Sequence, residues 1–430
     1  MLSKNITVSH NGTLNFAGYN TIELAKKYST PLYLMDEDMI RERIRVYKKA
    51  LCDFFPEGSV PEYASKAFSC KRIYEIANEE GINVDVVSVG ELYTAFKAGF
   101  PMERCFYHGN SKSVQDIEFA IDKGIGCFVV DNADELSLIN NIAENHGVMQ
   151  KIILRVTPGI DPHTHKKIST GSVESKFGIP IDDDALEATR IALNCKNISL
   201  EGFHCHIGSQ IFESEPFVTA AKVMIKFMAQ VRDKLGFTAT TLNLGGGFGV
   251  QYTENDPVID YRARIKEVAV AVNEISQNEK FEVPKILMEP GRSLVADAGM
   301  TLYTVNNVKE IKDYRNYVSI DGGMTDNPRY ALYESEYTVY NASKASQEAN
   351  YVVTIAGRCC ESGDLIQENV RIAKPEVNDI IAVATTGAYN YSMASNYNRV
   401  ARPCVVMLNS NRDYIAVKRE SLDDLIRLDV

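Results

Sequence analysis

Eight short apolar segments of this sequence are each followed by a polar or glycine-rich group that could take part in chemistry. The first is Lys66, whose primary amine comes directly after the strand-like Tyr63-Ala64 and could form a Schiff base. A single lysine in such a place is usually a solvated loop residue, so the repetition of the pattern carries the argument. In chain order the groups are Lys66, Asp85 with Ser88, His108-Gly109-Asn110, Asp131, Arg155, His206-Ile207-Gly208-Ser209, Gly245-Gly246-Gly247 and Glu289-Pro290-Gly291-Arg292.

Two of these groups suit a phosphate. Gly245-Gly246-Gly247 leaves backbone N–H groups able to approach an anion closely, and Ser209 could add a hydroxyl. A glycine run alone usually marks only a tight turn. This one follows the seventh predicted strand, which is a common phosphate position in parallel barrels.

The elements that must position these groups repeat as apolar strand, polar turn, amphipathic helix and glycine. That rhythm predicts an α/β fold, a (β/α)8 TIM barrel, in which the strand ends share one face. An open doubly wound sheet is the alternative. The predicted strands are Pro61–Ala64, Val84–Val87, Cys105–Tyr107, Cys127–Val130, Ile152–Val156, Leu200–Cys205, Thr241–Leu244 and Ile286–Met288. Predicted helices include Lys71–Glu80, Glu91–Ala98, Ala133–His146 and Pro216–Leu235, and glycines expected just past helix ends are Gly81, Gly99, Gly124, Gly147 and Gly236.

The helical rhythm stops near Met300, and short β-branched segments separated by turns follow. They predict a mostly β C-terminal domain, sandwich- or barrel-like, over residues 296–430. The barrel is expected over residues 31–295. Residues 1–30 contain a strand pair around Asn11-Gly12 that is expected to join the β domain. The predicted β strands are Tyr303–Val308, Tyr317–Ile320, Tyr337–Tyr340, Tyr351–Ile355, Ile380–Val383, Cys404–Leu408 and Tyr414–Val417.

Composition narrows the possible partners and compartment. The 430 residues carry a net charge of -11, which disfavours nucleic acid and anionic membranes as partners. The first residues lack an apolar signal region, and no apolar run is long enough to span a bilayer. The nine cysteines form no C-x-x-C pair, which fits reduced thiols in a cytoplasm.

Six motifs in a fixed order resemble the fold type III pyridoxal-phosphate decarboxylases, related to alanine racemase and ornithine decarboxylase, and most of all their diaminopimelate-specific branch. The resemblance covers essentially the whole chain, including Gly387-Ala388-Tyr389 near its end. The motifs are Tyr63-Ala64-x-Lys66-Ala67, His206-Ile207-Gly208-Ser209-Gln210, Gly245-Gly246-Gly247-Phe248-Gly249, Glu289-Pro290-Gly291-Arg292, Asp321-Gly322-Gly323-Met324 and Cys360-Glu361-Ser362-Gly363-Asp364.

The resemblance implies roles for individual residues. Lys66 would hold pyridoxal 5'-phosphate as a Schiff base, Glu289 would pair with the pyridine nitrogen, and His206 would stack on the ring. Cys360 would protonate the decarboxylated carbon. The phosphate and the rest of the cofactor would contact Ser209, Gly245, Gly246, Gly247, Gly291, Arg292 and Tyr389.

The resemblance also implies a substrate, meso-2,6-diaminopimelate, which would be converted to L-lysine and CO2 in the last step of lysine biosynthesis. The distal carboxylate would meet Arg292, Arg329 and Tyr333, with Tyr389 alongside, and Glu361 would face the distal amine. Arginine suits a carboxylate through its fixed fork of donors. Related decarboxylases of ornithine, lysine or carboxynorspermidine are the alternative, and a non-catalytic homologue is a third possibility.

Some positions stay open at this stage. His204 and His206 could be a metal pair, but too few other histidines accompany them, so no metal is expected. His163 and His165 are expected in a loop, and Asp85 and Arg155 have no assigned role. Val89, Phe68 and Tyr330 depart from the family pattern, which bears on substrate preference.

The resemblance implies a homodimer with shared active sites. In the family, the partner chain supplies the equivalents of Cys360 and Glu361, whereas Tyr389 comes from the same chain as the lysine.

Overall fold

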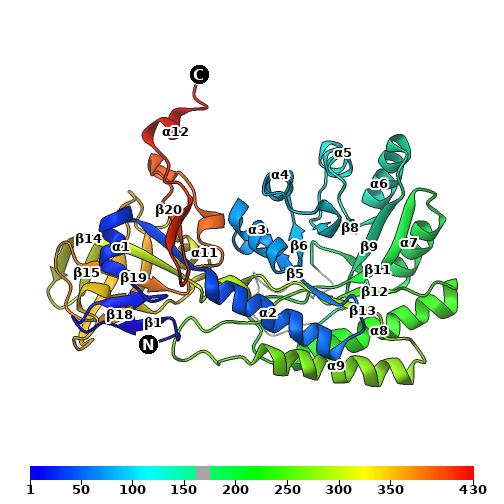
Figure 1. Cartoon of the computed structure of the whole chain (residues 1–430), viewed down its shortest axis with the longest axis horizontal. Coiled ribbons are helices and arrows are strands. Elements are labelled where there is room, and N and C mark those ends of the chain that lie inside the picture. The colour runs from blue at the N-terminus through cyan, green and yellow to red at the C-terminus, as the bar shows by residue number, and fades with distance from the viewer. Residues whose placement is uncertain (161–174) are drawn as a thin grey trace. The chain divides into compact units, whose positions relative to one another are not determined.

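The computed structural model describes residues 1–160 and 175–430, so the loop expected around His163 and His165 lies outside the described residues. The chain divides into two compact units. The barrel unit comprises Arg43–Gly249 and Ile259–Gly291, and the β unit comprises Met1–Glu42, Val250–Val258 and Arg292–Val430. Figure 1 shows the elements of both units.

The barrel unit contains a closed parallel barrel, as predicted. Its strands follow one another around the barrel in the order β5, β6, β7, β8, β9, β11, β12, β13, and β13 pairs again with β5. The closing register places Met288 opposite Pro61. The strands are β5 Val60–Ala64, β6 Asn83–Val86, β7 Cys105–Tyr107, β8 Cys127–Val130, β9 Gln150–Thr157, β11 Ile198–His204, β12 Thr241–Asn243 and β13 Lys285–Met288, with β10 Ile179–Pro180 added beside β9.

Helices follow the barrel strands and lie around them (Figure 1). Their ends carry the expected signals: a capping box at Ser113, and left-handed glycines at Gly147 and Gly236 that close two helices. The elements are α3 Lys71–Glu79, α4 Val89–Lys97, α5 Val114–Asp122, α6 Ala133–His146, α7 Asp183–Asn194, α8 Glu215–Leu235 and α9 Tyr261–Asn278, with 3-10 turns η1 Ser65–Ala67 and η2 Met102–Arg104; α2 Glu37–Phe54 runs from one unit into the other.

The β unit is built on a second sheet in the order β18-β17-β15-β14-β4-β20-β21, with β19 pairing with both β14 and β16. Its strands are β4 Leu32–Asp36, β14 Gly299–Ile311, β15 Arg315–Ile320, β16 Val339–Asn341, β17 Tyr351–Ala356, β18 Leu365–Ile372, β19 Ile380–Ala384, β20 Cys404–Leu408 and β21 Asp413–Val417. Its other elements are β1 Ile6–Val8, β2 Leu14–Phe16, β3 Tyr19–Asn20, α1 Thr21–Tyr28, α10 Arg292–Val295, α11 Arg329–Tyr333, α12 Leu422–Ile426 and the 3-10 turns η3 Ala342–Lys344, η4 Tyr391–Met393 and η5 Tyr397–Arg399.

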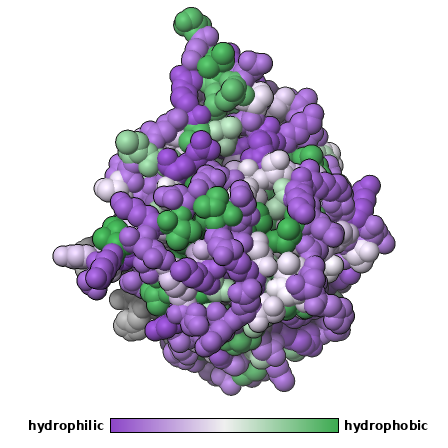
Figure 2. Space-filling view, turned by 90° about the vertical axis from the view of Figure 1, so that its left-hand side faces the viewer, coloured by the Kyte–Doolittle hydropathy of each residue, from purple (hydrophilic) through white to green (hydrophobic). Residues whose placement is uncertain are grey.

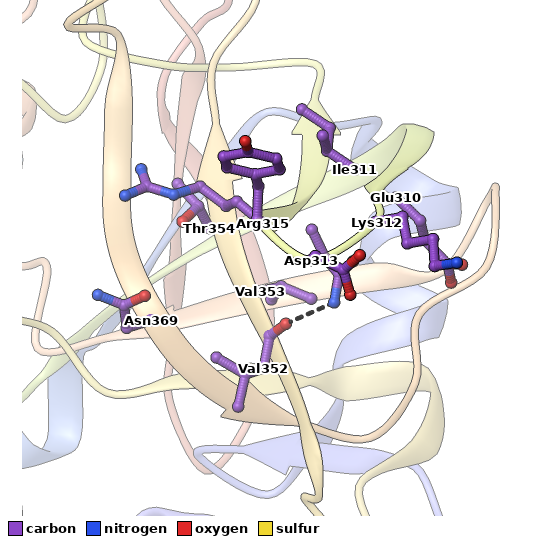
Figure 3. A pocket seen from close by; sticks show the side chains of 11 residues that line it. Glu310, Ile311, Lys312, Asp313, Arg315, Val352, Val353, Thr354 and Asn369 are labelled. Carbon is purple, nitrogen blue, oxygen red and sulfur yellow. Dashed lines mark hydrogen bonds between the residues drawn. The ribbon is translucent and has the colours of Figure 1, made fainter.

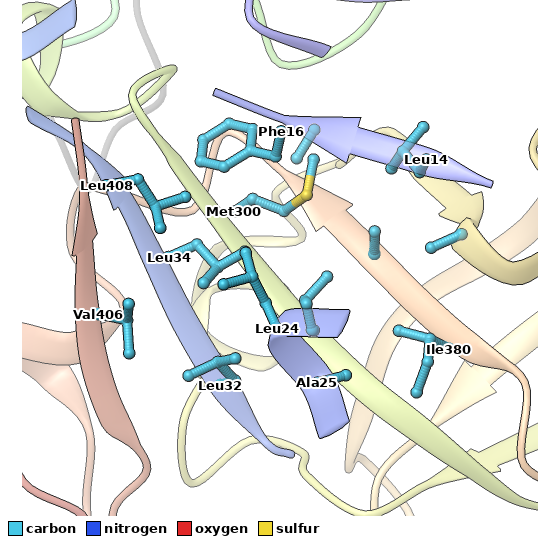
Figure 4. Close-up of a cluster of buried hydrophobic side chains, with 14 of the residues drawn as sticks. Leu14, Phe16, Leu24, Ala25, Leu32, Leu34, Met300, Ile380, Val406 and Leu408 are labelled. Atoms are coloured by element: carbon cyan, nitrogen blue, oxygen red, sulfur yellow. The ribbon is translucent and has the colours of Figure 1, made fainter. Parts of the chain in front are cut away.

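One apolar cluster joins the N-terminal segment to this sheet (Figure 4). Leu14 and Phe16 of the hairpin β1–β2 are fully buried against residues of the sheet such as Leu34 and Met300. Fully burying a side chain of this size contributes roughly 1.5–3 kcal/mol. The N-terminal strands therefore form a small sheet of their own and join the β unit by packing, without pairing with its main sheet.

The observed layout differs from the expected one at several places, including Val250–Val258, which belongs to the β unit. Strand β4 falls in the range expected for the barrel, but it pairs with β14 and β20 of the β unit. Strand β18 was not predicted at all. It lies at the sheet edge, where polar residues such as Glu368 and Asn369 break the apolar pattern, and the backbone of Asn369 has a positive φ of 53°. None of the described helices combines the length and the apolar character needed to cross a membrane.

Candidate active site

Lys66 lies in the turn η1, immediately after β5, and its side chain is exposed. The end of β5 packs against the segment that follows β13: the Ala64 N–H donates to the Pro290 carbonyl at 3.3 Å. A Cβ on Gly291 would come within 3.0 Å of the Ala64 Cβ. The fold thus brings the segment of Lys66 directly against the segment of Glu289.

The glycine run and the His206–Ser209 loop also meet. The Ile211 N–H donates to the Gly247 carbonyl at 2.9 Å. A Cβ on Gly247 would approach the Gly208 carbonyl oxygen to 2.4 Å, and its φ of +120° is one that side chains rarely adopt. Glycine is therefore required where these two predicted cofactor loops touch.

His206 is held as a neutral imidazole in one tautomer. Its Nδ1 accepts from the Gly246 N–H at 3.2 Å, which leaves the ring proton on Nε2. Burial, and then the charge of nearby Lys66, holds the pKa of His206 well below its usual range. A neutral ring fixed by the glycine loop suits stacking on an aromatic cofactor.

Glu289 directly follows β13 and lies in a buried cluster of imidazoles and carboxyl groups. The Nε2 of His204 lies 2.9 Å from its Oε1, and the Nε2 of His108 lies 3.5 Å from the same oxygen. His108 also makes a 2.9 Å hydrogen bond with Glu62. Despite these neighbours, Oε1 of Glu289 makes no hydrogen bond of good geometry to any described residue. A buried acceptor of this kind fits an N–H donor such as a protonated pyridine nitrogen.

The acids of this cluster differ in protonation. Burial would raise the pKa of Glu289, but His204 and His108 outweigh it, and the pKa lies well below the usual range. Burial, followed by repulsion from Glu289, raises the pKa of Glu62 and of Asp85 well above theirs. The cluster therefore keeps its negative charge on Glu289.

Several other groups at the strand ends have structural partners. The Ser88 hydroxyl caps α4 by accepting from the Glu91 N–H at 3.2 Å. Asp131 accepts from the Gly178 N–H at 2.9 Å. Arg155 is buried, with its guanidinium 4.4 Å from the centre of the Phe177 ring. Some of the groups that were predicted to converge at the strand ends therefore make structural contacts at the barrel rim.

In the β unit, two buried arginines lie among tyrosines. Arg292 donates to the Tyr252 hydroxyl at 2.6 Å and lies 4.8 Å from the Tyr389 ring centre. Arg329 lies 5.4 Å from the ring centre of Tyr333 and 5.7 Å from that of Tyr389. The structure therefore groups all four residues that were predicted to bind the distal carboxylate or lie beside it, and adds Tyr252.

Arg329 lacks an acidic partner. Its Nη2 donates to the Ser335 hydroxyl at 3.2 Å, its Nε makes no hydrogen bond, and no ion pair links it to any carboxylate of residues 1–160 or 175–430. Burial would lower its pKa, but the hydroxyl groups of Tyr252, Tyr337 and Tyr389 raise it above the usual value. A buried guanidinium with an unused N–H is a strong site for an anion.

Cys360 and Glu361 are exposed on a loop whose backbone is firmly held. The Cys360 N–H donates to the Asn398 side chain at 2.9 Å. The buried Asp364 accepts from the Cys359 N–H at 2.7 Å and from the Met324 N–H at 2.6 Å. These contacts join two of the sequence motifs, since Met324 ends the Asp321–Met324 motif and Asp364 ends that of Cys360. Burial and Asp364 raise the pKa of the Cys359 thiol to about 11.

Sequence reasoning missed Glu62, His204 and Tyr252 as members of these groups. His204 and His206, which were weighed as an alternative metal pair, have separate neighbours: His204 lies beside Glu289, whereas His206 accepts from the Gly246 N–H. Ligand atoms of His108, His204 and Glu289 do lie within 4.8 Å of one another. A charged residue inside the buried strand β5 was the available signal for Glu62.

One pocket of the β unit lies away from the predicted site residues. It has a volume of about 600 Å³ and is lined by the β14–β15 hairpin and residues of β17 (Figure 3), and it includes none of the predicted site residues.

Comparison with known proteins identifies the family. Residues 37–296 match the family model described as "Pyridoxal-dependent decarboxylase, pyridoxal binding domain". Diaminopimelate decarboxylase of Bacillus subtilis is 44% identical over 98% of this chain and 96% of the relative, and that of Bacillus methanolicus is 46% identical over 96% of each. The crystal structure of diaminopimelate decarboxylase from M. jannaschii in complex with L-lysine superposes with a TM-score of 0.91 at 34% identity, covering 100% of this chain and 99% of that one. The chain therefore belongs to the diaminopimelate decarboxylases, within the pyridoxal-dependent decarboxylases.

Proposed function

We propose that this chain removes one carboxylate of meso-2,6-diaminopimelate as CO2 and releases L-lysine, with pyridoxal phosphate held on Lys66. The observation that carries the proposal is the buried Arg329, which has no carboxylate partner among the described residues. A substrate that brings its own distal carboxylate would supply that partner. A simple diamine precursor would leave the guanidinium unpaired.

The residues of the barrel unit fit the cofactor. Lys66 supplies the amine, and the loops of Ser209 and Gly245-Gly246-Gly247 with Gly291 offer the close backbone approach that a phosphate needs. Neutral His206 would cover one face of the ring. Glu289 offers its buried, unpaired oxygen to the ring nitrogen. When bound, the cofactor supplies the electron sink for the electron pair left by CO2.

The residues of the β unit handle the substrate. Arg329 and Arg292 would bind the distal carboxylate, with Tyr333 and Tyr389 against them. Glu361 would face the distal amine, and Cys360 would deliver a proton to the carbon that lost CO2. Asn398 and Asp364 fix the loop of Cys360 so that the thiol stays in place.

Steady-state kinetics test this assignment. We expect kcat/KM for meso-diaminopimelate to exceed that for L-lysine, L-ornithine and carboxynorspermidine by at least about 10²-fold, since a buried arginine left unpaired costs several kcal/mol. Comparable values for L-lysine or L-ornithine would assign the chain to the related decarboxylases instead.

The proposal includes a homodimer with shared sites. Cys360 and Glu361 are exposed in the single chain, and the C-terminal segment exposes Leu422, Ile426 and Leu428 at 78%, 57% and 84%. Apolar residues stand out at the top of the space-filling view in Figure 2, where the chain ends. Exposed apolar residues of this kind support burial against a second copy.

Mixing two inactive variants tests the shared site. Lys66→Ala and Cys360→Ala chains should each be nearly inactive, but half of the randomly reassorted dimers would contain one intact site, so activity should return to roughly a quarter of wild type. A mixture of either variant with itself is the control. Exchange of subunits shown by mass spectrometry, without recovered activity, would mean that each chain completes its own site.

The cysteines support a cytoplasmic location as part of this proposal. All nine are free thiols, which suits a reducing compartment.

A further inference from the structure

Glu62 is an acid in an unusual place. It lies in the middle of strand β5 with a side chain exposure of 0%, and neither sequence motifs nor the proposed chemistry gives it a role. Its Oε1 is bonded to His108, and its Oε2 is buried without a hydrogen-bond partner among the described residues. Burial of an unexplained carboxyl group in a barrel interior is costly unless it serves a neighbour.

That neighbour is Glu289, which His108 links to Glu62. The His108 Nε2 lies 2.9 Å from an oxygen of Glu62 and 3.5 Å from an oxygen of Glu289. The His204 ring stands edge-on to the His108 ring, with centres 5.1 Å apart, and its Nε2 also faces Glu289. Glu289 therefore has two imidazoles beside it, whereas Glu62 has one.

Two carboxylates joined through one imidazole cannot both ionise cheaply in a buried site, because the charges repel where little water screens them. The second imidazole favours the charge on Glu289. Neither ring nitrogen of His204 makes a hydrogen bond of good geometry to a described residue, and its Nε2 lies 2.9 Å from Glu289 Oε1, close enough to interact with the charge there. The pKa directions agree, since burial raises that of Glu62, whereas that of Glu289 lies below its usual range.

We infer that Glu62 and His108 are positioning residues for Glu289: a protonated Glu62 accepts the Nε2–H of His108 on its carbonyl oxygen, and His108 with His204 keeps the single negative charge on Glu289. The inference rests on the proposed role of Glu289 toward the cofactor's ring nitrogen. The strength of the cofactor as an electron sink would then depend partly on Glu62. This residue bonds to His108 and need not touch the cofactor.

Infrared spectroscopy of the holoenzyme tests the protonation of Glu62. The difference between wild type and Glu62→Gln should contain the C=O stretch of a protonated carboxylic acid at neutral pH. Glu62→Gln preserves shape and neutrality, so its cofactor dissociation constant and visible spectrum should match those of wild type. Absence of the band, or loss of cofactor affinity in Glu62→Gln, would show that Glu62 is ionised and overturn the inference.

Removing the imidazole tests the link. His108→Leu should weaken cofactor binding about tenfold, which corresponds to one pKa unit on Glu289, and should change the visible spectrum of the bound cofactor. Glu62→Leu should produce a smaller change in the same direction. His146→Leu, an exposed histidine of α6, is the matched control and should bind the cofactor as wild type does.

The outcomes separate the inference from the proposed role of Glu289. If Glu289→Gln leaves the spectrum of the bound cofactor unchanged, the proposed role of Glu289 toward the ring nitrogen is wrong. If Glu289→Gln changes it but His108→Leu does not, His108 is only part of the core. Should His108→Leu lose its fold by circular dichroism, the Glu62→Gln and Glu62→Leu pair decides by the same spectrum.

Discussion

The interior of the barrel unit and the arginine group of the β unit differ in the sign of their buried charge. In the barrel, Glu289 is an anion surrounded by imidazoles, and its free oxygen awaits a donor. In the β unit, Arg329 is a cation surrounded by phenol groups, and it awaits an acceptor. The difference indicates the kind of ligand atom that suits each unit: an N–H donor in one and an anionic oxygen in the other.

The largest effect should come from removing the amine of the barrel unit. Lys66→Ala should abolish turnover and the covalent cofactor linkage without changing the fold, because Lys66 supplies the amine of the turn that follows β5. Borohydride reduction and mass spectrometry of the peptide measure the linkage. Lys71→Ala, an exposed lysine at the start of α3, should keep it. A borohydride-trapped cofactor in Lys66→Ala would remove Lys66 from the site.

Neutralising the anion of the barrel unit comes next. Glu289→Gln should retain the cofactor but lower kcat by about 10²–10³-fold, as for the loss of one charge-stabilising group. The amide no longer favours a protonated ring nitrogen. Single-turnover rates under saturating cofactor give the value, and a near-normal kcat would mean that another group tunes the ring.

Removing the cation of the β unit should affect binding of one substrate class. Arg329→Ala should weaken kcat/KM for diaminopimelate by on the order of 2–5 kcal/mol, mostly through KM, because a charge-assisted contact to the distal carboxylate is lost. A substrate without that carboxylate should change far less. Arg371→Ala, an exposed arginine of β18, is the control. Equal losses on both substrates would contradict the comparison.

The last effect concerns stability rather than catalysis, and it depends on a buried acid of the β unit. Burial raises the pKa of Asp326 from 3.8 to about 7. The native state then keeps a proton that the unfolded state releases, so stability should fall as pH rises from about 4 to about 7 and level off above it, by at most about 4 kcal/mol. Asp326→Asn should flatten this part of the profile in urea unfolding at pH 5 and pH 8. An unchanged slope would mean that Asp326 is ionised in the native state.

Much of this architecture follows from the sequence for a physical reason. A strand that is buried on both faces must be apolar, so the eight barrel strands and the polar groups at their ends are visible as a rhythm. The glycine loop was predictable too, because the close approach of Gly247 to Gly208 excludes any side chain. Lys66, His206 and Glu289 follow from the same pattern.

The remainder depends on contacts between distant segments. No local feature of the sequence indicates that the Asp364 carboxylate accepts from the Met324 N–H, or that Glu62 of β5 meets His108, which follows β7 on the far side of β6. Strand β18 escaped because its exposed edge position permits polar residues. The periodicity of a sequence indicates which residues are buried. It does not indicate which distant segments lie side by side, and the features named here depend on that.

The central place of β4 has a consequence for the order in which the chain is made. Leu32–Asp36 leaves the ribosome early, yet both strands that flank it, β14 and β20, lie beyond the whole barrel in sequence. The nascent chain must therefore carry this buried, apolar strand unpaired while the barrel is synthesised. A fragment beginning at Arg292 would have the converse defect, since β14 and β20 would each present an open edge to other chains.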